Sequence, residues 1–223
     1  MILNTNSLMQ TIDAVNERLI FGQEIPPEEG LEAARWISSL QGKKGAYRVL
    51  FAPTPSDYEQ GIRLFTGERL VSASARHILG QEAARVVWLF GRQDPQVRET
   101  YQRATAWMEA APDFIQSGTF CCGRCTLAFW RHIWVGDFKN KEARLVRGLQ
   151  AIKESRLGDG KWSRFPFFYA IYTLLDLELE PAIAELHYAQ KAMENYARRP
   201  REGAYTKRRS TIFEKALERV SRA

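Results

Sequence analysis

Three apolar helical segments recur at nearly constant spacing, and this repeat constrains the fold more than any other feature of the sequence. Aligned on Ala84, Ala128 and Ala170, the segments are separated by 44 and 42 residues. The third segment, which begins at Phe165, is apolar on almost every side, and such a helix is normally buried. The repeat therefore predicts three buried helices of related sequence.

Amphipathic helical segments alternate with the apolar ones. They lie around Trp36, Trp107 and Leu149 and carry charged residues on one side, so we expect them to face solvent. A single helix pair of this kind cannot bury its apolar member, and successive pairs must therefore stack. The sequence predicts an all-α fold of stacked helix hairpins.

Capping and proline signals set the expected helix boundaries. Ser7-x-x-Gln10 matches a capping box, and Pro26-Pro27 followed by two glutamates indicates a helix that runs to about Leu40. Further helices are expected over residues 72–90, 95–110, 120–135, 139–156, 165–178, 181–198 and 211–222. Two short strands, Val49–Phe51 and Ile62–Phe65, are expected to pair as a hairpin.

Length and composition favour one globular domain. The 223 residues suffice for a packed core, with helix pairs in residues 27–180 and further helices, joined by a basic linker, in residues 181–223. No apolar stretch approaches the roughly 20 residues of a bilayer-spanning helix. No secretory signal is evident, and three cysteines argue against a disulfide scaffold. We expect a cytoplasmic protein without a transmembrane segment.

The positive charge is concentrated in one place. The chain has a net charge of +6, and residues 198–209 contribute +5 of it. The rest of the chain is close to neutral, so nucleic-acid binding is not favoured. Residues 198–209 are expected to form a solvated linker, with contact to phosphates or a membrane surface as the alternative.

Two segments of related spacing follow amphipathic helices. They are Trp36-Ile37-x3-Gln41-x3-Gly45-x-Tyr47 and Arg147-Gly148-x3-Ile152-x3-Arg156-x3-Gly160-x-Trp162. Both resemble the QW repeat of squalene–hopene cyclases, with arginine in place of glutamine in the second. The chain thus resembles the terpenoid cyclase and protein prenyltransferase superfamily over residues 27–180. This resemblance implies a partial α/α toroid, its concave face covered by the first helix, the C-terminal helix or a second subunit in a homo-oligomer.

A third segment resembles another part of this superfamily. Cys125-Thr-Leu-Ala-Phe129-Trp130 is similar to the Cys-Tyr-Ser-Phe-Trp segment of protein prenyltransferase β subunits, whose cysteine binds zinc. The other zinc ligands of that family, an aspartate and a histidine, correspond to Gly123 and Tyr169 here. The Asp-rich acid motif of the cyclases is absent. We therefore expect no stoichiometric zinc, and zinc is only a secondary possibility.

The three cysteines lie together at the expected start of the second apolar helix. Cys122-x2-Cys125 has the spacing of a metal-ligand pair, and His77 on the preceding apolar helix is better placed to join it than His132. Packing of small buried side chains is the simplest alternative. A nucleophilic or redox-active thiol, favoured by the helix N-terminus, is another.

Stacked helix pairs place the N-termini of the apolar helices at one end of the stack, which we call the mouth. Arginines and a lysine lie at these positions in the sequence, and together with the helix dipoles they predict an anion site. The residues are Arg63, Arg69, Arg76, Arg124, Lys161 and Arg164. The irregular link 41–72, which includes Phe65 and Glu68, is expected to form a lid over the mouth. Solvated loop charges are the alternative.

Polar residues on the apolar helices complete the candidate site. His77, Gln81 and Arg85 form one stripe, which predicts either a ligand-lining face or buried pairing of Arg85 with Glu82. The candidate catalytic residues are His77 and Cys125. The candidate ligand-binding residues are Glu68, Arg69, Arg76, Arg85, Arg124, Arg164 and Tyr169.

These residues favour a small anionic, partly apolar ligand bound at the mouth, and the resemblance implies that this ligand would be of isoprenoid type. The resemblance implies that any enzyme activity would be prenyltransferase-like or terpenoid-cyclase-like, and the residues leave open whether there is one. A non-catalytic scaffold, whose concave face binds a peptide or protein, is the alternative. A closed aromatic pocket would favour the ligand, and an open groove the scaffold.

Overall fold

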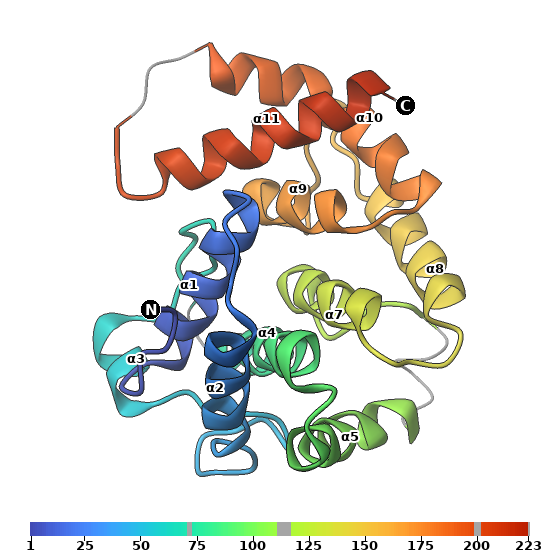
Figure 1. Ribbon diagram of the computed structural model, residues 1–223. Coiled ribbons are helices and arrows are strands. Elements are labelled where there is room, and N and C mark those ends of the chain that lie inside the picture. Colours follow the sequence, from blue (N-terminus) through green and yellow to red (C-terminus); the bar gives the residue numbers. More distant parts are fainter. Residues whose placement is uncertain (71–72, 111–116, 199–201, 223) are drawn as a thin grey trace.

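The computed structural model describes residues 1–70, 73–110, 117–198 and 202–222, and within these ranges it contains ten helices and no strand. This confirms the predicted all-α fold. The helices are α1 (Leu8–Ile20), α2 (Pro27–Ser38), α3 (Pro55–Gln60), α4 (Ser74–Gly91), α5 (Pro95–Ala110), α7 (Gly123–Val135), α8 (Lys141–Glu154), α9 (Phe167–Asp176), α10 (Glu180–Ala197) and α11 (Thr206–Arg222) (Figure 1). Among the described residues no helix is both long and apolar enough to span a bilayer.

The predicted hairpin between Val49–Phe51 and Ile62–Phe65 is wrong, because helix α3 forms between these segments. Thr54 caps α3 in a reciprocal capping box with Asp57, and Pro55 occupies the first helical turn. The buried Asp57 carboxylate also accepts hydrogen bonds from Ser7 Oγ and from the backbone of α1. These contacts join the link 41–70 to α1.

The three apolar helices α4, α7 and α9 form one row and run in the same direction. Near the start of α4, His77 faces Cys125 of α7, and one to two turns later Glu82 faces Arg131. The α9 lead-in lies against the start of α7, whereas Asp176 at the end of α9 pairs with Arg131. Ala84, Ala128 and Ala170 are all fully buried, which confirms the prediction of three buried helices. We call α4, α7 and α9 the inner helices, and α2, α5, α8 and α10 the outer helices.

The two QW-like segments make equivalent contacts with the next outer helix. Gln41, after α2, donates a hydrogen bond of 2.7 Å to the backbone oxygen of Thr100 in α5. Arg156, after α8, donates to the Glu185 carboxylate of α10 at 2.7 Å, and Trp162 Nε1 donates to the same carboxylate at 2.9 Å. The first segment therefore connects α2 to α5, and the second connects α8 to α10.

Helix α1 packs on α4, and α11 packs on α9 and α10; α1 and α11 also contact each other (Figure 1). Arg208 in the first turns of α11 pairs with Asp13 of α1 at 2.8 Å and donates to the backbone oxygen of Phe65. Arg209 donates to the backbone oxygen of Thr66. The prediction that residues 198–209 form a solvated linker is therefore wrong for Arg208 and Arg209, whose contacts connect α11 to α1 and to the loop before α4. Arg199 and Arg201 lie outside the described residues.

Candidate functional site

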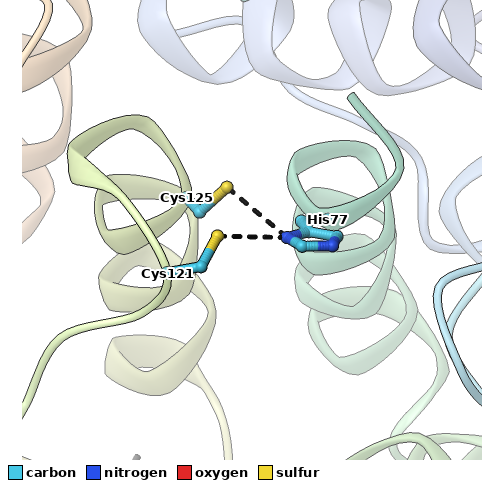
Figure 2. A group of neighbouring side chains, drawn as sticks. All are labelled: His77, Cys121 and Cys125. Carbon is cyan, nitrogen blue, oxygen red and sulfur yellow. Dashed lines mark hydrogen bonds between the residues drawn. The ribbon is translucent and has the colours of Figure 1, made fainter. Parts of the chain in front are cut away.

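Three potential ligand atoms meet at the start of the inner helices. His77 Nδ1 of α4 lies 3.2 Å from the sulfur of Cys121 and 3.7 Å from that of Cys125 (Figure 2). All three atoms lie within 4.8 Å of one another, and no other such group of histidine, cysteine and acidic side chains occurs in the described ranges. The fold therefore unites residues that are 44 and 48 positions apart in the chain.

Aromatic rings hold the His77 imidazole in place. The Tyr47 ring, at the aromatic position of the first QW-like segment, lies 3.8 Å from the imidazole centroid, and Phe120 packs edge-on at 5.5 Å. Partial burial, followed by the neighbouring Arg76 charge, lowers the pKa of His77 below its usual value. The neutral imidazole, with a free nitrogen lone pair, is therefore favoured at neutral pH.

The three thiols differ in exposure and in acidity. Cys121 and Cys122 are exposed, whereas Cys125 is buried. Burial raises the pKa of Cys125 well above its usual value and also raises that of Cys121. Burial opposes ionisation of Cys122 as well, but hydrogen bonds from the Cys125 backbone and thiol and from the Arg124 backbone lower its pKa. As a free thiol, Cys122 is better suited to nucleophilic attack than the predicted Cys125.

Gly123 and Tyr169 stand at the positions that correspond to the other two zinc ligands of protein prenyltransferase β subunits, and both have different roles here. A Cβ atom at Gly123 would lie 1.9 Å from the backbone oxygen of Arg164, so any larger side chain would push the α9 lead-in away. Tyr169 is buried in the interior and donates a hydrogen bond to Glu82 at 2.5 Å. These two positions therefore do not provide the aspartate and histidine ligands that this family uses.

Three of the predicted arginines lie at the mouth beside the thiols. Arg76 is in the first turn of α4, Arg124 in the first turn of α7, and the exposed Arg164 just before α9. Arg164 lines a cleft of about 130 Å³ together with Cys121 and Cys122. Its other lining residues are Thr119, Phe120, Gly123, Thr126, Ala151 and Phe165.

The other predicted ligand residues lie elsewhere. Arg85 is buried in the interior, where it donates to Asn16 of α1 and pairs with Asp176, so the expected Arg85–Glu82 pair is wrong. Arg69 is exposed in the loop between α3 and α4, and Glu68 of the same loop accepts a hydrogen bond from Thr66. None of these residues lines the cleft at Cys121 and Cys122.

A buried polar network that sequence reasoning missed fills the interior between α1, α4, α7 and α9. Its centre is Arg131, which is fully buried, donates to Glu82 and Asn16, and lies 3.8 Å from the Tyr172 ring centroid. The available signal was an arginine within the apolar segment Phe129-Trp130-Arg131. The hollow beside Glu82 and Tyr169 measures only about 10 Å³, which is about the space of one water molecule.

Part of the predicted lid packs against α4 and α9. The Phe65 ring lies 4.9 Å from the Tyr172 ring of α9 at a tilt of 34°, and Leu64 and Phe65 line the small interior hollow with Ile78 and Tyr169. Larger hollows, of about 380 and 520 Å³, lie on the outside against α10. Of the candidate residues, Arg164 lines the cleft beside Cys121 and Cys122, and Tyr169 lines the small interior hollow.

Comparisons with protein families, with curated proteins and with solved structures found nothing that matches this chain. The likeness to terpenoid cyclases and protein prenyltransferases therefore stays a prediction from the QW-like segments.

Proposed function

We propose that this protein binds a small anionic ligand with a short apolar part, isoprenoid-like in character, in the cleft at the mouth. The observation that carries the proposal is the position of Arg76, Arg124 and Arg164 at the mouth, where Arg164 lines the cleft. These arginines come from the starts of three adjacent inner helices, and none pairs with an acidic side chain within the described part of the chain. Guanidinium groups without counter-charges suit phosphate or diphosphate groups.

The first turns of the helices support the same proposal. The first turns of α4, α7 and α9 contain no acidic residue. The outer helices α2, α8 and α10 do have glutamates in their first turns, and Asp94 just before the outer helix α5 accepts hydrogen bonds from the backbone of Gln96 and Val97. These carboxylates compensate the positive ends of the outer helix dipoles. The absence of acidic residues from the first turns of α4, α7 and α9 favours an anion at the mouth.

The walls of the cleft favour a ligand that is only partly polar. Phe120 and Phe165 line it beside the hydroxyls of Thr119 and Thr126. A volume of about 130 Å³ suits a phosphate group with a short chain better than a long polyprenyl group. The proposed ligand class is thus a short-chain prenyl phosphate or diphosphate.

The scaffold alternative has less support. Helices α1 and α11 pack on the inner row and occupy the face that a bound peptide would need. The buried Arg131 and Glu82 side chains fill the space behind them. A ligand at the mouth requires no displacement of these helices.

Calorimetric titration with dimethylallyl diphosphate, inorganic diphosphate and the uncharged alcohol tests the proposal. At low ionic strength we expect the prenyl diphosphate to bind most tightly and the alcohol not to bind. Arg124→Gln and Arg164→Gln should each weaken binding about tenfold, or about 1.4 kcal/mol. Arg98→Gln, an exposed arginine on α5, is the matched control and should change nothing. Equal affinities for all three compounds, or a loss of affinity in Arg98→Gln as large as in the Arg124 and Arg164 variants, would rule the proposal out.

A further inference from the structure

We propose that His77, Cys121 and Cys125 bind one zinc-class metal ion through one imidazole nitrogen and two thiolates. This inference goes beyond the proposed anion site and does not depend on it. It also differs from the zinc set implied by the family resemblance, because Cys121 and His77 replace the aspartate and histidine of that set. Of the six cysteines and histidines in the chain, three thus meet at one point.

The distances between the ligand atoms fit a single metal ion. Zinc lies about 2.3 Å from sulfur and about 2.0 Å from imidazole nitrogen in tetrahedral sites, which places neighbouring ligand atoms about 3.5–3.8 Å apart. The His77 nitrogen lies 3.2 Å and 3.7 Å from the two sulfurs. The two sulfurs lie within 4.8 Å of each other, so movements of at most about 1 Å would complete the coordination geometry.

Two of the three ligands, His77 and Cys125, are held by helices before a metal binds. Cys125 is fully buried on α7, and α7 packs closely along α4, which carries His77. The Tyr47 and Phe120 rings fix the imidazole so that Nδ1 points toward both sulfurs (Figure 2). Side chains that are already oriented lose little conformational freedom when they bind a ligand.

The donor set and its charge favour zinc over the hard cations. Thiolate and imidazole ligands select Zn²⁺ and related ions, whereas Mg²⁺ and Ca²⁺ require oxygen ligands. On binding, the two thiols lose their protons to solvent, and two thiolates balance the double charge of the metal. The resulting site is electrically neutral, which suits a half-buried position next to Arg76.

Three protein ligands leave the fourth tetrahedral position for water or a substrate group, as in catalytic rather than structural zinc sites. Cys121 is exposed and lines the cleft, so this position is reachable from solvent. The Cys122 thiol is not within 4.8 Å of all three ligand atoms. We therefore assign Cys122 as a neighbour of the metal and not as a ligand.

Metal analysis of the reduced full-length protein, loaded with zinc alone and desalted, tests this site. We expect one zinc per chain in the wild type and in Cys122→Ser, the matched control. Cys121→Ser, His77→Gln and Cys125→Ser should each bind at least tenfold more weakly in competition with a chelator. Loading with Co²⁺ should give thiolate-to-cobalt charge-transfer absorption and the visible bands of tetrahedral cobalt.

Cys121→Ser is the decisive variant, because Cys121 is exposed and outside the helices, so its loss should leave the circular dichroism spectrum unchanged. Less than one zinc per ten wild-type chains would overturn the proposal. Full zinc in folded Cys121→Ser, or loss of zinc in Cys122→Ser, would overturn the ligand assignment. No anion is added, so this result is independent of the diphosphate titration, and either proposal can fail alone.

Discussion

Arg131 of α7 donates a hydrogen bond from Nε to the Glu82 carboxylate of α4 at 2.8 Å, and both side chains are buried. Glu82 also accepts from Tyr169 of α9, and Arg131 also pairs with Asp176. Together these contacts connect all three inner helices. Because the network lies in the interior, its hydrogen bonds can all be satisfied only when the helices face one another in this way.

Removal of Arg131 should destabilise the fold severely. Arg131→Met leaves Glu82 as a buried carboxylate without its partner, and losses of about 3–5 kcal/mol are typical of such changes. The double variant Arg131→Met/Glu82→Gln should lose clearly less than the sum of the single variants, because it leaves no unpaired buried charge. Urea denaturation followed by circular dichroism measures both. Additive losses would contradict a direct pairing of the two residues.

Stability should fall on acidification because of His132. This buried histidine interacts with Gln81 at 2.6 Å and with Tyr101 at 3.2 Å, and burial, aided by the Arg85 charge, lowers its pKa to about 3. Between about pH 6.5 and 3 the unfolded chain therefore binds a proton that the folded chain does not. The folded state loses about 1.4 kcal/mol per pH unit from this group as pH falls through that window.

His132→Gln tests this origin of the pH dependence. The variant should be less stable than the wild type at pH 7, and the difference in unfolding free energy should narrow by about 2 kcal/mol on going to pH 5. Urea titrations at pH 7, 6 and 5 provide the comparison. A difference that stays constant over this range would exclude His132 as the titrating group.

The basic segment should contribute to stability through Arg208. Arg208→Gln removes the ion pair with Asp13 and the hydrogen bond to the Phe65 backbone, which should cost about 1.5–3 kcal/mol. Arg198→Gln changes an exposed side chain and should stay within about 0.5 kcal/mol of the wild type. Thermal unfolding of both variants distinguishes them. Equal melting temperatures would indicate that the contacts of Arg208 do not stabilise the docking of α11.

Exposure should set the order in which the thiols react. In reduced, metal-free protein we expect iodoacetamide to label Cys122 and Cys121 before Cys125, because only Cys125 is buried. Mass spectrometry of timed digests gives the order, and labelling in urea should abolish the differences. Preferential labelling of Cys125 in the folded state would mean that the start of α7 opens readily.

The periodic pattern of the sequence determined the all-α fold and the alternation of buried and exposed helices. Ala84, Ala128 and Ala170 are buried as the 44- and 42-residue steps predicted, and Ser7 caps α1 as its motif predicted. These features depend on local geometry, since capping and amphipathicity are set within one or two turns of helix. The link 41–70 lacked such periodicity, and its capping box at Thr54 was missed among turn-forming prolines.

The tertiary structure alone decided which side chains meet. The meeting of His77 with Cys121 and Cys125, and of Arg85 with Asn16 and Asp176, depends on how far each helix is rotated about its axis. That rotation results from packing between residues that are 41 to 91 positions apart in the chain. One example is the approach of Arg164 to Gly123, which only a glycine permits. Residue spacing along one helix does not specify the rotation of a neighbouring helix. The sequence could therefore suggest that His77 approaches the cysteines, but not that Cys121, rather than Cys122, completes the group.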